Sequence, residues 1–342
     1  MPVHRRRALR RAPRVALVVV CCAIACGDWD QRPRLIANSP TGPVGPSVSP
    51  IVVDTGQLPG GRLAFVDQAK GSPARVYTMR VDGSELMAVS PADRSSWMPI
   101  WSPDGTRLAY WSDGPETGNG VWVVRGDGTG STRISDGGHS PFWLDDARVG
   151  YACDVDLCVV GADGSQRSTL LARTQTYGVY DENFRLSPDG QTLAFTRYDP
   201  FAGWDYGSSS VFVLKVDGGG EQRLPATVSS YTWGDAHPSW SPDGRRIAFS
   251  SAAFGILVAA ADGGTARSIS GFDRASVLSR EIGVGGPAWS PDGKQIVFGG
   301  SARAFYIANA DGFGSIRRVR VSMPDSDAGG TYERHSWSWT SR

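Results

Sequence analysis

The chain has 342 residues, of which 40% are hydrophobic and 20% are charged, so its composition is that of a globular protein and not of a disordered one. Its 43 glycines and 12 tryptophans favour short strands joined by turns over long helices. The formal net charge of +1 includes six arginines within the first 26 residues; without them, 29 basic residues stand against 34 acidic ones, a net charge near −5. This balance excludes a basic surface for nucleic acid.

The first 26 residues have the organisation of an export signal. Arginines are frequent over residues 5–14, and an apolar stretch over residues 15–25 is too short to span a bilayer as a stable helix. The segment ends in AIAC, with Gly27 after Cys26, and this sequence resembles the bacterial lipobox. The resemblance implies a signal peptide over residues 1–26 and a lipid on Cys26, with Gly27 favouring the outer membrane. An ordinary cleaved signal with an incidental cysteine is the alternative.

Residues 27–57 contain proline, glycine and serine without hydrophobic periodicity. This composition predicts a flexible tether between the membrane and a folded body over residues 58–342.

The folded body contains one motif many times. WSPDGTRLAY at residues 101–110 recurs as WSPDGRRIAF at 240–249, as WSPDGKQIVF at 289–298 and, with Leu186 in place of tryptophan, as LSPDGQTLAF. More divergent copies begin at Pro59 and at Trp143. A second Asp-Gly turn follows each copy, at Asp82, Asp127, Asp163, Asp217, Asp262 and Asp311, so the sequence predicts six repeats of about 45 residues.

Each repeat predicts a small antiparallel sheet. Pro-Asp-Gly and Asp-Gly form tight turns, and the runs between them alternate apolar and polar residues with the period of half-buried strands. Four strands result per repeat, and packing the sheets radially buries both faces of each. The first repeat begins at its second strand, whereas the chain ends in HSWSWTS, a first-strand motif. We therefore predict an all-β, six-bladed β-propeller whose C-terminal strand joins blade one and closes the ring.

These motifs resemble the TolB-like propeller repeats, a WD-like family with the consensus PxWSPDGxxIAF, over residues 58–342. The resemblance implies a propeller of the bacterial cell envelope that has no catalytic residues and docks peptide segments or partner proteins.

Cys153 and Cys158 are an even pair on two strands of the third repeat, joined by a very short connection. A hairpin disulfide is expected in an oxidising compartment, and two buried free thiols are the alternative.

Strand alternation places the longer connections, between the second and third strands and between consecutive repeats, on one face of the ring. These connections contain nine aromatic residues, Tyr177, Tyr180, Tyr198, Phe201, Trp204, Tyr206, Tyr231, Trp233 and Tyr332. Exposed tyrosine and tryptophan are typical of binding hot spots and of sugar-stacking surfaces, so we predict a binding face here. Packing of these rings against one another to order the loops is the alternative.

His139, Glu182, His237 and His335 each precede the first strand of a repeat, so they could meet at the central axis. Such a set can bind zinc or manganese. The register differs, however, because His139 and His335 lie four residues before the motif tryptophan and His237 lies three before it. Polar residues that hydrate the channel are the alternative interpretation.

The folded body lacks a GxSxG nucleophile motif, an HExxH zinc motif and a phosphate-binding loop. We therefore predict a monomeric, exported binding propeller without a cofactor, whose partner is an envelope protein, a peptide or an oligosaccharide, and whose contact with a membrane is the N-terminal lipid. The alternative is a metal-dependent polysaccharide lyase-like or carbohydrate-binding propeller, because oligogalacturonate lyases carry similar repeats with histidine-rich metal sites at the axis.

Overall fold

The computed structural model describes residues 61–68, 71–114, 118–173, 179–201, 208–224, 236–251, 255–269, 286–299, 304–312, 316–320 and 338–340. By its contacts the chain divides into two units, Met1–Ser49 and Pro50–Arg342, and all described residues belong to the second. The predicted signal, tether and Cys26 lie outside them. Strands and turns make up the described residues, and no helix among these residues is long and apolar enough to cross a membrane.

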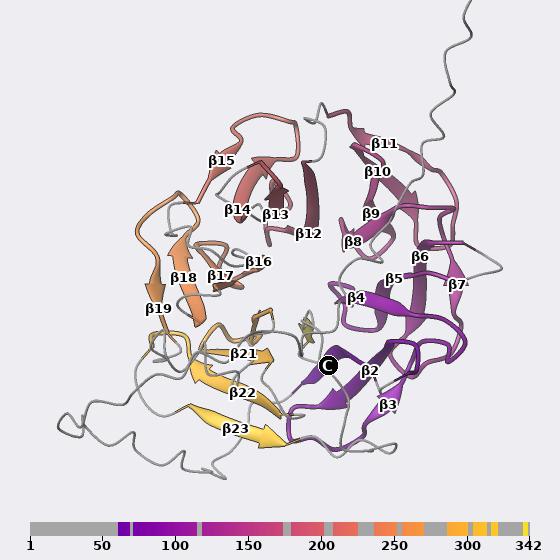
Figure 1. The fold of residues 1–342 in the computed structure, drawn as a ribbon, viewed down its shortest axis with the longest axis horizontal. Helices are drawn as coiled ribbons and strands as arrows, with labels where there is room; N and C mark the ends of the chain where they lie inside the picture. The colour runs from indigo at the N-terminus through magenta and orange to yellow at the C-terminus, as the bar shows by residue number, and fades with distance from the viewer. Residues whose placement is uncertain are drawn as a thin grey trace, which may run out of the picture. The chain divides into compact units, whose positions relative to one another are not determined.

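The strands form six four-stranded antiparallel sheets, which are the predicted blades (Figure 1). Blade 1 contains β1 (Arg62–Asp67), β2 (Arg75–Arg80), β3 (Met87–Ala88) and β24 (Ser338–Thr340), and blade 2 contains β4 (Ser96–Trp101), β5 (Arg107–Ser112), β6 (Gly120–Arg125) and β7 (Thr132–Arg133). Blade 3 contains β8 (His139–Trp143), β9 (Arg148–Cys153), β10 (Asp156–Gly161) and β11 (Ser168–Leu171), and blade 4 contains β12 (Tyr180–Leu186), β13 (Thr192–Asp199), β14 (Ser208–Lys215) and β15 (Gln222–Arg223). Blade 5 contains β16 (Ala236–Trp240), β17 (Arg246–Ser251), β18 (Gly255–Ala260) and β19 (Arg267–Ser268), and blade 6 contains β20 (Ala288–Trp289), β21 (Gln295–Gly299), β22 (Ala304–Asn309) and β23 (Arg317–Arg320).

The C-terminal strand closes the ring as predicted. β24 is the inner strand of blade 1 and pairs antiparallel with β1, with Leu63 opposite Trp339 and Arg62 opposite Thr340. The first and last parts of the described chain therefore share one sheet, as the colours of Figure 1 show.

The Pro-Asp-Gly turns have the predicted geometry. In four repeats the aspartate Oδ1 accepts a hydrogen bond of 2.9 to 3.1 Å from the backbone N–H two residues later; these aspartates are Asp104, Asp189, Asp243 and Asp292. A serine hydroxyl two residues before each aspartate donates a second bond to the same oxygen. Both bonds stabilise the turn, so the carboxylates serve the fold.

The inner strands of blades 2 to 5 carry the same irregularity. In each, the pairing with the next strand shifts register around a residue in the left-handed region, with φ between 51° and 58°; these residues are Met98, Ser140, Asn183 and His237. A bulge of this kind adds one residue to the strand and re-aims the side chains before it. It therefore determines which side chains near the axis are equivalent between blades.

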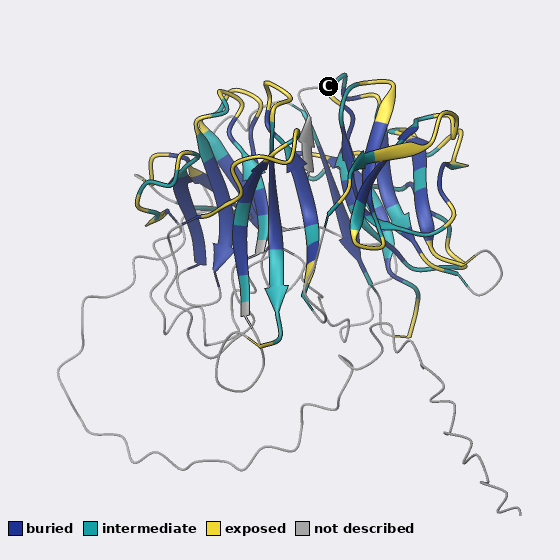
Figure 2. Ribbon diagram, turned by 90° about the horizontal axis from the view of Figure 1, so that it is seen from above, coloured by how far each residue is buried: buried dark blue, intermediate teal, exposed yellow. Residues whose placement is uncertain are grey.

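Buried side chains fill the space between neighbouring blades, and Figure 2 shows buried residues along the strands with exposed ones at the turns. A tryptophan on the inner strand also ties its blade to the preceding one. The indole Nε1 of Trp143 donates to the carbonyl of Ile100 at 3.1 Å, Trp240 donates to Arg185 at 2.9 Å, and Trp289 donates to Ser239 at 3.0 Å. Each such bond contributes about 1 kcal/mol. Blade 4 has Leu186 at this position, so it cannot make this bond to blade 3.

Candidate functional site

The candidate binding surface lies where the adjacent ends of β12 and β13 meet in blade 4. Tyr180 pairs with Tyr198 across the two strands, and their ring centroids are 4.9 Å apart. Tyr180 is 43% exposed, and Phe201, just beyond β13, is 69% exposed. The backbone N–H of Phe201 donates to the Asp199 carboxylate at 2.8 Å, which fixes the turn that presents the ring. We call Tyr180, Tyr198 and Phe201 the blade 4 aromatic surface.

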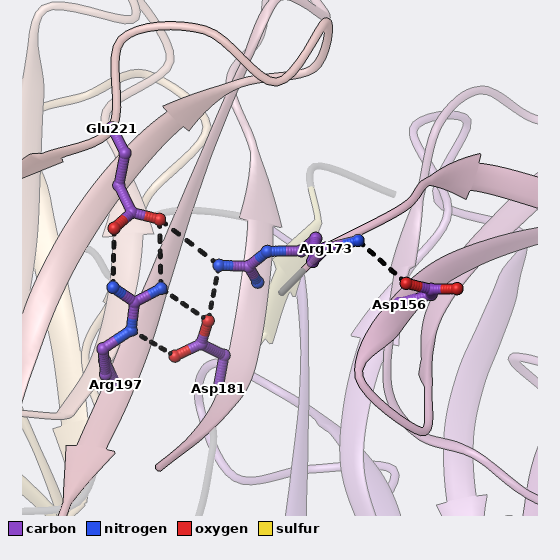
Figure 3. Close-up of polar contacts among 5 residues, drawn as sticks. All are labelled: Asp156, Arg173, Asp181, Arg197 and Glu221. Atoms are coloured by element: carbon purple, nitrogen blue, oxygen red, sulfur yellow. Dashed lines mark hydrogen bonds and ion pairs between the residues drawn. The ribbon is translucent and has the colours of Figure 1, made fainter. Parts of the chain in front are cut away.

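Two arginines and two carboxylates form an ion-pair network in the same part of blade 4 (Figure 3). Asp181 and Arg197 are the strand neighbours of Tyr180 and Tyr198, so their side chains lie on the opposite face of the sheet from this tyrosine pair. Asp181 is buried, and its two carboxylate oxygens accept from Arg197 Nε at 2.8 Å and from Arg173 Nη2 at 2.6 Å. Glu221 accepts from Arg197 Nη1 at 2.6 Å and lies 3.3 Å from Arg173 Nη2. We call Arg173, Asp181, Arg197 and Glu221 the blade 4 network; its formal charges sum to zero.

The network is set among aromatic rings and shifts the pKa values of two of its members. The Arg197 guanidinium carbon lies 4.6 Å from the ring centre of Phe212, and that of Arg173 lies 5.0 Å from the ring centre of Phe195. Burial lowers the pKa of Arg197, but hydrogen bonds from its guanidinium to Asp181 and Glu221 outweigh burial and raise it. The same bond to Arg197 is the main reason why the pKa of Glu221 lies below its usual value. Arg197 and Glu221 therefore both stay ionised at neutral pH.

The network also joins two blades where the tryptophan bond is missing. Arg173 follows β11 of blade 3, whereas Asp181, Arg197 and Glu221 belong to blade 4. At the same junction Phe142 of blade 3 contacts Phe184 of blade 4, with ring centroids 5.9 Å apart, and Phe184 in turn contacts Phe195 within blade 4 at 5.3 Å. Ion pairs and aromatic packing thus connect blades 3 and 4 where Leu186 replaces the tryptophan.

The structure places Tyr180 and Tyr198 on strands, although the sequence predicted that they lie in connections between strands. The prediction was wrong at these two residues because β12 and β13, with seven and eight residues, extend beyond the motif that marks a typical blade. Six other aromatic residues of the predicted face lie outside the described residues: Tyr177, Trp204, Tyr206, Tyr231, Trp233 and Tyr332.

The predicted axial residues fall into two kinds of position. His139 and Glu182 immediately precede the bulge residues Ser140 and Asn183, whereas His237 is itself a bulge residue. His139 Nδ1 lies 3.0 Å from the Ser140 hydroxyl, and burial lowers the pKa of its imidazole. Among the described residues there is no group of three His, Cys, Asp or Glu that could hold a metal ion, and His335 lies outside them.

Two neighbours on β12 are unusual in their surroundings. Burial, with a smaller contribution from the Asp181 charge, raises the pKa of Glu182 to about 7. Asn183 is fully buried in a left-handed conformation, and within the described part of the chain neither its side-chain oxygen nor its side-chain nitrogen has a hydrogen-bond partner.

Sequence reasoning did not find the blade 4 network. Its members are separated by up to 48 residues, and only the pairing of β12 with β13, which sets Asp181 opposite Arg197, brings them together. One signal was available, namely the change from tryptophan to Leu186 in an otherwise regular motif. It marks the blade whose junction needs other contacts.

The propeller fold is shared with proteins of known structure. No protein-family model matches the chain. A curated relative, the protein TolB homolog of Chlorobium luteolum (strain DSM 273 / BCRC 81028 / 2530), is 27% identical over 170 residues, which cover 48% of this chain and 36% of the relative. The crystal structure of TolB from Acinetobacter baumannii aligns with a TM-score of 0.57 at 18% identity, over 82% of this chain and 66% of that one. The chain has a TolB-like β-propeller fold.

A second solved structure agrees with this TolB-like fold. The putative TolB from Agrobacterium tumefaciens aligns with a TM-score of 0.50 at 18% identity, over 76% of this chain and 88% of that one. The TolB-like chain spans about a third of the curated homolog and just under two thirds of the Acinetobacter protein. The comparisons therefore bear on the fold of the propeller.

Proposed function

We propose that this protein is an exported binding propeller that docks a protein or peptide of the bacterial cell envelope on the blade 4 aromatic surface. The observation that carries the proposal is the exposure of Tyr180 and Phe201, which with Val155 are the exposed large apolar side chains among the described residues. Exposed aromatic rings on a rigid support are typical of binding hot spots. The TolB-like fold supports the choice of an envelope protein as the kind of partner.

The blade 4 network supports an apolar contact with that partner. Its arginines and carboxylates pair with one another, so the network adds no net charge to this part of blade 4. Binding through the rings then depends on apolar area, and salt has little effect on its affinity. An oligosaccharide that stacks on the same rings is the alternative ligand, and the binding test separates the two.

Substitution of the exposed rings tests the surface. The full chain is used to recover partners from an envelope extract, and each recovered partner is purified and titrated against wild type, Phe201→Ser and Tyr180→Ser. We expect each substitution to weaken binding by about tenfold or more, since exposed aromatic anchors contribute about 2 kcal/mol or more. Val155→Ser is the matched control, because it removes an exposed apolar side chain one blade away. Equal affinities for all four proteins contradict the proposed surface, and capture of saccharides alone would favour the alternative.

The membrane attachment rests on the sequence at Cys26. We propose that the signal is removed before this cysteine and that a lipid on it holds the propeller at a membrane, on the outer membrane or the periplasmic face. Mass spectrometry of the mature N-terminus is expected to find a diacylated Cys26, and Cys26→Ala is expected to move the protein from the membrane to the soluble fraction. A soluble wild-type chain that begins at another residue contradicts the anchor.

A further inference from the structure

A disulfide joins the two strands of the β9–β10 hairpin in blade 3, and the acidic residue Asp156 lies between its two cysteines in the sequence. Cys153 and Cys158 are joined, with their Cα atoms 5.8 Å apart. Asp156 lies opposite Cys153 in the register of the hairpin and two residues before Cys158. Asp154, in the two-residue turn, adopts a left-handed conformation with φ of 65°. The disulfide therefore holds a short and conformationally demanding turn, with Asp156 at its end.

Asp156 extends this constraint beyond the hairpin. Its carboxylate Oδ1 accepts a hydrogen bond of 2.8 Å from the backbone N–H of Arg173, 17 residues later and just after β11. Figure 3 shows Asp156 on one side of Arg173 and the rest of the blade 4 network on the other. The position of the Arg173 backbone thus depends on the position of Asp156.

Arg173 continues the connection into blade 4. Its guanidinium bonds to the buried carboxylate of Asp181 at 2.6 Å and contacts Glu221 at 3.3 Å, and the arginine side chain is only 7% exposed. Buried ion pairs stabilise only when their geometry is good, because both charges have lost their hydration. A small displacement of the Arg173 backbone would weaken the pair with Asp181, whose neighbour Tyr180 belongs to the aromatic surface.

We propose that the Cys153–Cys158 disulfide positions the blade 4 aromatic surface through Asp156 and Arg173, and that reduction of this bond loosens the surface. The contacts carry the proposal; only its consequence for binding rests on the proposed function. The disulfide is accessible to a reductant, because Cys153 is half-buried and the adjoining turn residues are exposed, with Val155 at 40%. The redox state of the hairpin would then control the surface of the next blade.

The chemistry needs a dithiol as co-reactant. One thiolate of the dithiol attacks Cys153 Sγ, a mixed disulfide forms, and Cys158 leaves as a thiolate that takes up a proton. The second thiolate of the reagent attacks the mixed disulfide and releases Cys153. The protein gains two electrons and two protons, and the dithiol is oxidised to its own disulfide.

Hydrogen exchange at the Arg173 amide tests the connection without any partner. Exchange is measured on the full chain in the oxidised form, after reduction with dithiothreitol, and in the Cys153→Ser/Cys158→Ser variant. We expect the Arg173 amide to exchange at least tenfold faster in the last two, with displaced ring-proton shifts for Tyr180 and Tyr198. The amides of Ile296 and Val297 in blade 6 should keep their rates. Exchange at Arg173 that stays within twofold of the oxidised protein overturns the proposal.

Asp156 variants keep the test valid even if reduction unfolds the hairpin. Asp156→Ala removes the acceptor and leaves the disulfide intact, so its Arg173 amide should exchange as fast as that of reduced wild type. Asp156→Asn keeps an acceptor oxygen and should remain near wild type. Slow exchange in Asp156→Ala overturns the proposal. If exchange responds as expected while Phe201→Ser binds the partner normally, the proposed function fails and the redox connection stands.

Discussion

Glu182 on β12 is a carboxyl whose pKa is raised by its surroundings. Its pKa is raised from 4.5 to about 7, mainly by burial and then by the charge of Asp181. Between these two pH values the unfolded chain has released this proton and the folded chain has kept it. The free energy of unfolding therefore falls as the pH rises from about 4.5 to 7, because the unfolded state binds fewer protons there.

Glu182→Gln should remove this loss of stability. The amide cannot ionise, so we expect the variant to be more stable than wild type at pH 8 by about 2 kcal/mol. This value is smaller than the free energy that corresponds to the full pKa shift, because Glu182 is only partly buried. Thermal unfolding monitored by circular dichroism from pH 4 to 8 measures the difference, which should vanish near pH 4.

Glu221→Gln is the opposite control for this measurement. The pKa of Glu221 is lowered by its bonds to Arg197. Its ionised carboxylate therefore adds to the free energy of unfolding above about pH 4.5, and this stabilisation is lost as the pH falls. The Glu221 variant should therefore be less stable than wild type at pH 8. If both variants shift stability in the same direction at pH 8, burial of Glu182 does not act as described.

The sequence predicted that His139, Glu182 and His237 precede the first strand of their repeats, whereas the structure places them within β8, β12 and β16. The bulge separates His237 from the other two by one residue, and a count back to the motif tryptophan already indicates that difference. The raised pKa of Glu182 could not be predicted, because burial depends on how neighbouring blades pack around β12.

In blade 3, Gly150 departs from the repeat pattern, and Phe142 on the neighbouring strand occupies the space that this leaves. Four blades have alanine at the centre of the second strand, namely Ala64, Ala109, Ala194 and Ala248, whereas blade 3 has Gly150. Gly150 lies opposite Phe142 in β8, and a Cβ atom at Gly150 would lie 2.3 Å from Phe142 Cζ. The phenylalanine ring occupies the space that the alanine methyl fills elsewhere.

Gly150→Ala should therefore destabilise the protein, although it introduces the residue found in four of the other five blades. Overpacking of this kind costs about 1 to 3 kcal/mol. Urea denaturation measures the loss, and Gly150→Ala with Phe142→Leu should recover part of it, since the smaller side chain makes room for the methyl. A single variant as stable as wild type, or a double variant less stable than the single one, contradicts this account of the pair.

The strands themselves were predictable because each is bounded by a turn with its own chemistry. Asp104 and its three equivalents mark where the first strand of a blade ends and the second begins. The blade 4 network lacked such a local signal, since Arg173 and Asp181 lie on different blades and Glu221 comes 40 residues after Asp181. Its discovery required the register between strands and the contact between blades.

For the propeller as a whole, the repeats predicted the number of blades and the way in which the ring closes. Six Asp-Gly turns gave six sheets, and the unpaired start and end of the repeat pattern meet in blade 1. The aromatic face stays a prediction, since six of its nine residues lie outside the described part of the chain. The connections between strands have no repeat from which their positions could be predicted.

Because β24 closes the ring, we expect the stability of the whole propeller to depend on this strand. Deleting residues 336–342 removes β24, which leaves β1 with an unpaired edge and takes away the strand pairing between the last and first parts of the body. Loss of several kcal/mol should lower the melting temperature by roughly 10 °C, given about 2 to 4 °C per kcal/mol for a body of this size. Deleting only Ser341 and Arg342 keeps β24 and is the matched control. A peptide of residues 331–342, added to the shortened chain, should restore part of the loss by pairing with β1. A melting temperature within 2 °C of the full chain would mean that blades 1 and 6 hold together without the strand, and that the ring does not depend on its C-terminal closure.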